Sequence, residues 1–193
     1  MKAEAELIAG NRRFIEKGGT DFEALSKGQH PKSVVIACSD SRVAPEIIFD
    51  AKLGELFVVR TAGGVVDSAA LASVEYAVEH LGTKHIAIVA HTKCGAVTAA
   101  MQSLEKKIDS KNVRKNEMRS SLDNLIEDIY TNISAKISEK NRNTVDLDSA
   151  IIYNMKAQVK KLRGSRIIKK YLDRGLKISP LIYEIETGRL KKI

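Results

Sequence analysis

Two short segments carry the residues whose chemistry could define a site. Cys38, Asp40 and Arg42 follow one unbroken apolar run, and His91 and Cys94 follow another. The two cysteines are the only ones in the chain. Two thiolates and an imidazole form a soft ligand set that suits Zn²⁺ better than magnesium or calcium. Three protein ligands would leave one zinc position open, which is the arrangement of catalytic rather than structural sites.

The cysteines and the Asp40–Arg42 pair also have ordinary structural explanations. A lone cysteine after a strand is commonly a small buried hydrophobic residue. Asp40 and Arg42 could form an ion pair that only stabilises a loop. A cysteine-dependent phosphatase is set aside, because its phosphate loop requires an arginine six residues after the cysteine, whereas Arg42 is four residues after Cys38.

Buried strands must bring the two segments together. The run Val34–Ala37, with its β-branched residues, is typical of a strand buried on both faces of a parallel sheet. Further strands are predicted over 56–60, 85–90 and 177–185. In open α/β sheets ligands bind outside the carboxyl ends of the strands, which is where Cys38 and His91 stand. The sequence therefore predicts a site at that edge of the sheet.

Amphipathic helices alternate with these strands. They are predicted over 3–17, after Pro45, from Asp67 or Ser68 to Leu81, from Gly95 to about Leu104, from a cap at Asp148 through Val159, and over 166–172. The segment from 105 to about 148 is expected to form a surface helical excursion without chemistry. Alternation at these lengths favours an α/β fold with right-handed crossovers.

Composition limits the other classes of function. The chain has 193 residues, 44% of them hydrophobic, and a net charge of +8. Residues 101–193 hold 21 Lys and Arg against 12 Asp and Glu, but the densest basic stretch, 156–170, is interrupted at helical intervals by apolar residues. We interpret it as a solvated helix face and expect no nucleic-acid partner. With no long apolar run, we expect no membrane association and a cytoplasmic location.

The two segments that carry the cysteines resemble the motifs of a known family, the β-class carbonic anhydrases. The resemblance is carried by Cys38–Val43 and His91–Gly95, with further matches at 11–14, 57–60, 62–63, 75–78, 158–159, 162–163, 183 and 187–190. It implies one zinc per chain, held by Cys38, His91 and Cys94. It also implies a mainly parallel sheet of four to five strands, in the order 2-1-3-4, flanked by helices.

The resemblance further implies a reaction, the reversible hydration of carbon dioxide to bicarbonate and a proton by a zinc-bound hydroxide. Asp40 would orient the hydroxide while Arg42 holds Asp40; in part of the family the aspartate instead becomes the fourth zinc ligand in a closed state. The residues matching the substrate cleft are Gln29, Phe57, Ala62, Tyr76 and Gly95. For Phe57 and Tyr76, ordinary core packing is the alternative. The alternative functions are a related zinc hydrolase acting on another small heterocumulene, such as carbon disulfide, and a non-catalytic zinc- or bicarbonate-binding protein.

One domain over 1–193 is expected from length and from the resemblance. Its parts would be an N-terminal helical arm (1–30), a zinc-site core (31–102), a helical excursion (103–150) and C-terminal helices with the last strand (151–193). The family's N-terminal helix packs on a partner subunit, which implies a dimer or tetramer here. In the family's Arg-Asn-Ala-Gly-Asn loop this chain has Thr61 and Gly64 in place of the two asparagines.

Overall fold

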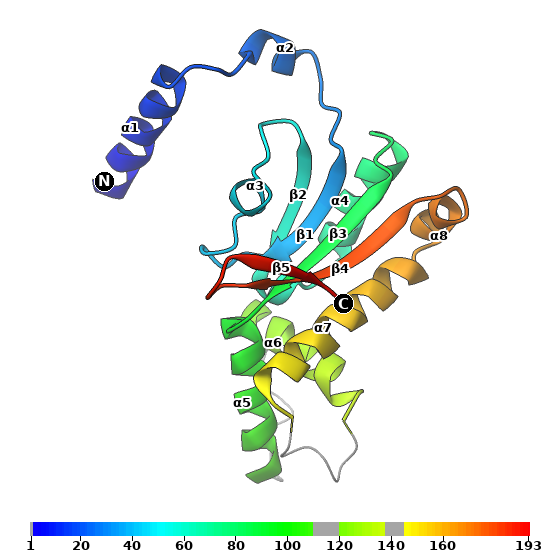
Figure 1. Ribbon diagram of the computed structural model, residues 1–193. Coiled ribbons are helices and arrows are strands. Elements are labelled where there is room, and N and C mark those ends of the chain that lie inside the picture. The colour runs from blue at the N-terminus through cyan, green and yellow to red at the C-terminus, as the bar shows by residue number, and fades with distance from the viewer. Residues whose placement is uncertain (1, 110–119, 138–144) are drawn as a thin grey trace.

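A five-stranded sheet organises the fold in the computed structural model, which describes residues 2–109, 120–137 and 145–193 (Figure 1). The strands are β1 (Ser33–Cys38), β2 (Leu56–Thr61), β3 (His85–His91), β4 (Lys177–Glu184) and β5 (Arg189–Lys192). Their order is β2-β1-β3-β4-β5; the first four are parallel and β5 is antiparallel to β4. This confirms the predicted class and the order 2-1-3-4, with β5 as an added edge strand.

The helices follow the predicted alternation with the strands. They are α1 (Lys2–Glu16), α2 (Phe22–Ser26), α3 (Pro45–Ile48), α4 (Ser68–Glu79), α5 (Gly95–Asp109), α6 (Ser121–Ser134), α7 (Leu147–Gly164) and α8 (Arg166–Leu172), with a 3₁₀ turn η1 (Ala62–Gly64). Asp67 caps α4 by accepting a hydrogen bond from the Ala70 amide at 2.8 Å. The cap predicted at Asp148 is wrong: Asp146 caps α7 instead, accepting from Ser149 N at 2.7 Å.

The two faces of the sheet are covered differently. Val34, Ile36, Ile86 and Ile88 point to one face and pack against α4, α7 and α8. The residues that alternate with them point to the other face, where they pack against α3 and its flanks, β5, and the ends of the neighbouring strands. Because β1 and β3 are apolar on both faces, they form the centre of the sheet.

A third cluster lies beyond the carboxyl ends of the strands and contains both cysteines. Ile129 and Ile133 of α6 are fully buried there, together with residues of α5 and α7. The described part of the segment expected to be a surface excursion is therefore part of the core beneath the candidate site. The rest of that expected excursion, 110–119 and 138–144, lies outside the described residues.

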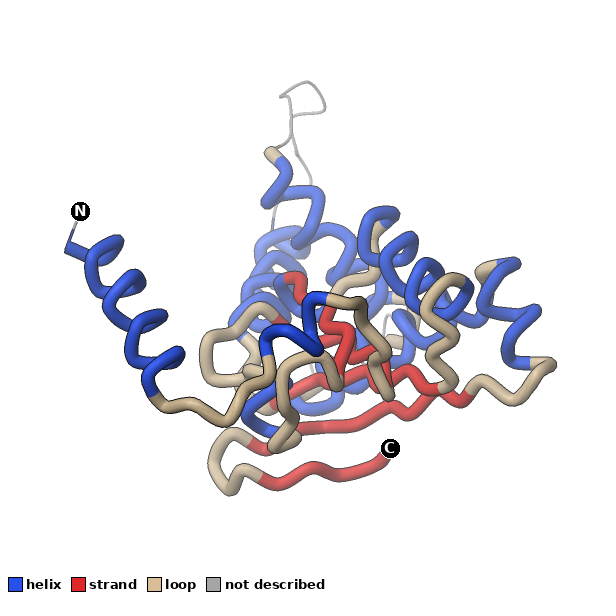
Figure 2. The backbone as a smooth tube through the Cα atoms, turned by 90° about the horizontal axis from the view of Figure 1, so that it is seen from above, coloured by secondary structure: helices blue, strands red, loops and turns tan. Residues whose placement is uncertain are grey.

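Helix α1 stands apart from the rest of the chain in both backbone views (Figures 1 and 2). It buries no residue. The apolar side chains of Leu7 and Ile15 are 77% and 54% exposed. Among the described residues, none of the helices combines the length and the hydropathy that crossing a bilayer requires.

Candidate metal centre

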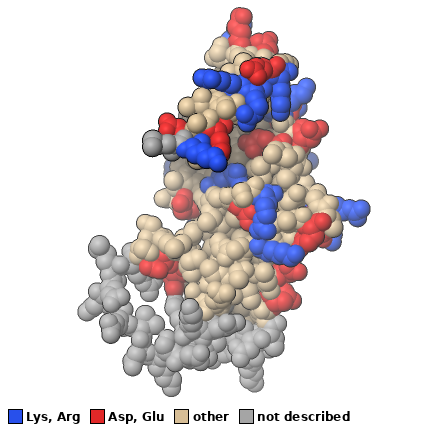
Figure 3. All heavy atoms as spheres, turned by 90° about the vertical axis from the view of Figure 1, so that its left-hand side faces the viewer, with Lys and Arg blue, Asp and Glu red and all other residues tan. Residues whose placement is uncertain are grey.

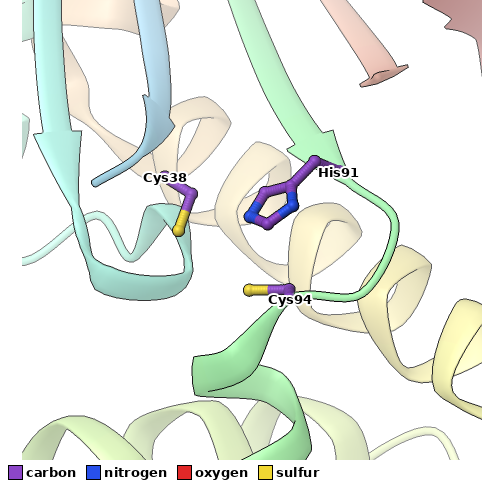
Figure 4. Close-up of side chains that lie close together, drawn as sticks. All are labelled: Cys38, His91 and Cys94. Atoms are coloured by element: carbon purple, nitrogen blue, oxygen red, sulfur yellow. The ribbon is translucent and has the colours of Figure 1, made fainter. Parts of the chain in front are cut away.

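Three strand-end side chains converge at the carboxyl edge of the sheet. Cys38 is the last residue of β1, His91 is the last residue of β3, and Cys94 immediately precedes α5. The parallel pairing of β1 with β3 brings these ends side by side. The two sulfurs and a ring nitrogen all lie within 4.8 Å of one another, and the side chains point toward a common centre (Figure 4).

The donor set and its hydrogen bonds fit a zinc ion. The Nδ1 atom of His91 lies 2.8 Å from the Thr92 carbonyl oxygen, which assigns the proton to Nδ1 and leaves the lone pair on Nε2. Nε2 is buried and has no hydrogen-bond partner among the described residues. A buried nitrogen without a partner is costly unless a ligand satisfies it. The His91 ring is therefore oriented as a metal ligand would be.

The two thiols share one buried environment and influence each other. A hydrogen bond from Cys94 lowers the pKa of the Cys38 thiol, and the Gly63 amide, 3.3 Å from the Cys38 sulfur, adds to this effect. The same contact raises the pKa of Cys94, since a second thiolate beside the first is repelled. A divalent cation would remove this conflict by allowing both sulfurs to be thiolates.

Asp40 stands beside the three ligands and is held by Arg42. The guanidinium donates to Asp40 through Nε at 2.9 Å and Nη2 at 2.7 Å, and the Arg42 backbone amide donates at 3.0 Å. These bonds hold the pKa of the Asp40 carboxyl well below its usual range, with the Arg42 side chain as the main cause. Oδ2 of Asp40 is 4.0 Å from His91 Nε2. An ionised carboxylate therefore borders the ligand cluster.

Arg60, which sequence reasoning did not place in the site, fixes the loop that carries Asp40. Its Nε donates to the Cys38 carbonyl at 3.1 Å and its Nη2 donates to the Asp40 carbonyl at 2.7 Å. The sequence feature that could have indicated Arg60 is its charge near the end of the otherwise mostly apolar strand β2. Asn154 and Gln158, buried amides on α7 that line the cavity beside the cluster, were also missed.

The five residues expected to line a cleft separate into two groups. Ala62, next to Thr61, and Gly95, next to Cys94, lie at the carboxyl edge with the ligand cluster. Phe57 pairs with Val34, four positions before Cys38, so it lies roughly 13 Å along the strand from the cluster. Tyr76 packs on Phe57, and Gln29 precedes β1 at the same far end. Within one chain the structure does not bring Gln29, Phe57 and Tyr76 to the ligands.

Comparison with known proteins gives a consistent result. A sequence model of the family described as carbonic anhydrase matches residues 33–190. Carbonic anhydrase 2 of Mycobacterium tuberculosis is 49% identical over 105 residues, 51% of each chain, so this match spans about half the length of that relative. A carbonic anhydrase of Pseudomonas aeruginosa is 32% identical over 176 residues, covering 88% of this chain and 76% of the relative.

Solved structures show the same fold. The β-carbonic anhydrase CafA of Aspergillus fumigatus superposes with a TM-score of 0.80 at 28% identity, covering 100% of this chain and 91% of the other. One of two tetrameric β-carbonic anhydrases from Sordaria macrospora gives a TM-score of 0.79 at 24% identity over 100% and 98% of the two chains. With the family match over most of its length and a Cys-His-Cys cluster at the carboxyl edge of the sheet, this chain belongs to the β-carbonic anhydrase family.

Proposed function

We propose that this chain is a zinc enzyme that interconverts carbon dioxide and bicarbonate. The observation that carries the proposal is the convergence of Cys38, His91 and Cys94, with the Asp40–Arg42 pair at its side. His91 Nε2, which no described residue hydrogen-bonds, is directed into the cluster. Family membership supports the same assignment, with one zinc per chain. When bound, zinc supplies a water of lowered pKa as a nucleophile.

The residues around the cluster determine how a nucleophile would be held. Oδ1 of Asp40 accepts two hydrogen bonds from Arg42, whereas Oδ2 accepts one. A carboxylate oxygen can accept two, so Oδ2 keeps acceptor capacity beside the ligands. Because Asp40 is ionised and accepts only, it would hold a hydroxyl group by its proton and direct the oxygen lone pairs toward the substrate. The Arg42 fork fixes the direction of the carboxylate.

A paired arrangement of subunits would bring the remaining cleft residues to the ligands. Gln29, Phe57 and Tyr76 lie far from the ligands of their own chain, and Tyr76 is 47% exposed. We propose that a second copy places these residues at the cluster, giving a dimer or a dimer of dimers. The apolar residues left exposed on α1 support such an interface.

We infer a reducing compartment from the same ligands. Both cysteines are free and buried, and their sulfurs lie within 4.8 Å of each other. A disulfide between them would remove two of the three proposed ligands. A cytoplasmic location is therefore proposed, because thiols stay reduced there.

The direct test combines metal analysis with stopped-flow carbon dioxide hydration on the same samples. The parent protein should contain one zinc per chain and hydrate carbon dioxide. Cys94→Ala and His91→Ala should lose both the zinc and the activity, whereas His30→Ala, which changes an exposed histidine, should keep both. Full zinc content in Cys94→Ala would contradict the metal site. A zinc-loaded parent that does not hydrate carbon dioxide would contradict the reaction and favour a related substrate or a binding role.

A further inference from the structure

Two side-chain amides of α7 are buried against the candidate metal centre. Asn154 is 3% exposed and Gln158 is 2% exposed, and they stand one helical turn apart on the same face. Both line a cavity of about 10 Å³ whose wall also includes Cys38 and His91. A buried amide is unfavourable unless its hydrogen-bonding groups are paired. The hydrogen-bond partners of Asn154 and Gln158 therefore indicate the role of these two side chains.

The hydrogen bonds of the pair connect α7 to the loop that follows β2 and also to α6, where Asn132 Nδ2 donates to Asn154 Oδ1 at 3.1 Å. Gln158 accepts from the Val66 amide through Oε1 at 2.9 Å and donates through Nε2 to Asn154 Oδ1 at 3.1 Å. Asn154 donates through Nδ2 to the Gly63 carbonyl at 2.9 Å. The two side chains thus contact the loop at Gly63 and at Val66, and their mutual bond fixes both amide orientations.

This loop needs external support because two consecutive glycines form its turn. Gly63 and Gly64 are consecutive and have φ of 67° and 64°, a left-handed conformation that glycine adopts readily but does not hold by itself. Within the loop, Thr61 Oγ1 donates to the Val65 carbonyl at 2.7 Å. The amide of Gly63 donates to the Cys38 sulfur at 3.3 Å. The geometry of that N–H···S bond depends on how the Gly63 peptide is held.

We propose that Asn154 and Gln158 are positioning residues for Cys38, which hold the Gly63 amide on the sulfur. The proposal rests on the zinc site proposed above. An N–H donor draws charge from a thiolate, so a zinc ion bound there remains a stronger Lewis acid than two unmodified thiolates would allow. This chain has Thr61 and Gly64 where the family's loop has two asparagines, so the loop itself has no side-chain amide at these two positions. The side-chain amides that hydrogen-bond the loop come from α7 instead.

The first experiment uses the parent protein loaded with ¹¹³Cd in place of zinc. If the Gly63 N–H is bonded to the metal-bound Cys38 sulfur, its amide proton should show a scalar coupling to ¹¹³Cd in the NMR spectrum. A parent protein that binds the metal through both cysteines but shows no such coupling overturns the proposal. A parent protein that binds no metal contradicts the zinc site itself, so the two failures are distinguishable.

The second experiment removes the side-chain donors and measures zinc affinity by chelator competition. Asn154→Leu should weaken zinc binding by about 10- to 100-fold and reduce or abolish the Gly63 coupling. Gln158→Met, which keeps the volume, should change both readouts in the same direction. Thr83→Val is the control. Thr83 is 4% exposed and its hydroxyl donates to the Pro31 carbonyl, so this substitution removes a buried hydrogen bond away from the Gly63 loop. Zinc affinity and the Gly63 coupling should both stay unchanged in this variant.

The outcomes separate positioning from packing. If Asn154→Leu does not fold, Asn154→Asp replaces it, since it keeps the size and the acceptor but lacks the donor to Gly63. Zinc affinity within about twofold of the parent, with an unchanged Gly63 coupling in the folded variants, means that the two amides only fill the core and overturns the proposal.

Discussion

At the residue scale, Arg42 determines where the Asp40 carboxylate points. We predict that Arg42→Ala lowers carbon dioxide hydration on the order of 10²-fold while zinc content stays full, because the carboxylate loses its orientation and becomes free to bind the metal. Arg42→Lys, which keeps the charge but not the planar fork, should retain part of the activity. The measurement is stopped-flow hydration on metal-analysed protein. Parent rates in both variants would mean that the pair only stabilises its loop.

The pH dependence of the same pair distinguishes orientation from ionisation. Arg42 depresses the pKa of Asp40, so the pair contributes stability above the ordinary carboxyl pKa of about 4 and loses it as the pH falls toward the lower folded value. Asp40 remains ionised at neutral pH even without Arg42. The loss of activity in Arg42→Ala at pH 7 should therefore not be recovered at pH 9.

Individual residue types explain why part of the site could be predicted from the sequence. Cys38, His91 and Cys94 stand at strand ends, and the rule that parallel strands end at one edge brings such residues together without further information. Asn154 and Gln158 were not found, because a polar residue on a helix indicates a solvated face unless its burial is known. The distance of Phe57 from the ligands could not be predicted either, since it depends on the register of β2 against β1.

At the element scale, the turn η1 combines a left-handed backbone with close packing. A Cβ on Gly63 would lie 2.8 Å from Ile129 Cδ1 in the core, whereas a Cβ on Gly82, with φ of 69°, would meet nothing within 4 Å. We predict that Gly82→Ala costs about 1 kcal/mol of backbone strain, and that Gly63→Ala costs about 1–3 kcal/mol more through overpacking. Urea unfolding of the metal-free proteins measures both.

A double variant isolates the packing part of that cost. Ile129→Val removes the Cδ1 atom, and the next Ile129 atom is 3.6 Å from the added Cβ. The combined Gly63→Ala/Ile129→Val protein should therefore be less destabilised than the sum of the two single variants. Strict additivity would show that backbone strain alone accounts for the cost at Gly63.

The loop between His91 and Cys94 is tied to the turn between β4 and β5. Glu186 pairs with Lys93 Nζ at 2.8 Å and accepts from Thr92 Oγ1 at 2.8 Å; Lys93 lowers the pKa of Glu186 to about 2, assisted by Thr92. We predict that Glu186→Gln is less stable than the parent at pH 7, and that the difference disappears as the pH falls from about 4.3 to about 2, through the depressed pKa.

Urea unfolding at pH 7, 5 and 3, at low and high salt, measures the Glu186 contribution. The ion pair is exposed, so its contribution should be small and should decrease with salt. Lys27→Gln, which removes a pair that is exposed to a similar or greater degree far from this loop, is the control. A stability difference between parent and Glu186→Gln that does not change with pH would contradict the assignment.

Elements with strong periodicity and clear boundaries were predictable, and short or ambiguous ones were not. Strands β1 and β3 are unbroken apolar runs, and α4 follows a clear Asp67 cap. Helix α2 was not predicted as a separate helix, because its five residues after the Gly18–Gly19 pair give too short a pattern. Asp146 and Asp148 are two positions apart and both suit a cap, so only the folded backbone distinguishes them.

At the scale of the whole molecule, the exposed face of α1 predicts assembly. Charged side chains of both signs are interspersed on the side of the molecule that carries α1 (Figure 3), so no broad patch of one sign opposes association there. Phe14 of α1 and Phe22 of α2 pack edge to face and are 41% and 47% exposed. Burying such residues against a second copy removes their apolar surface from water.

Sedimentation at micromolar concentration tests this assembly. We expect the parent to sediment as a dimer or tetramer and Phe14→Glu to shift toward the 21.2 kDa monomer, because a buried charge at the interface is unfavourable. Leu122→Glu on α6, where Leu122 is 64% exposed, is the control and should not change the assembly. A parent that sediments only as a monomer contradicts the paired arrangement.

The separation of Cys38 from Cys94 along the chain has a consequence for folding kinetics. The two sulfurs meet only after β1 has paired with β3 across the intervening β2–α4 crossover, and closing such a long loop carries an entropy cost that slows the step. An unfolded chain therefore does not hold the three ligands together for zinc. Zinc should therefore leave the refolding rate nearly unchanged and should lower the unfolding rate. The metal-loaded protein would then owe its persistence to slow unfolding, which is kinetic stability, and not to faster folding.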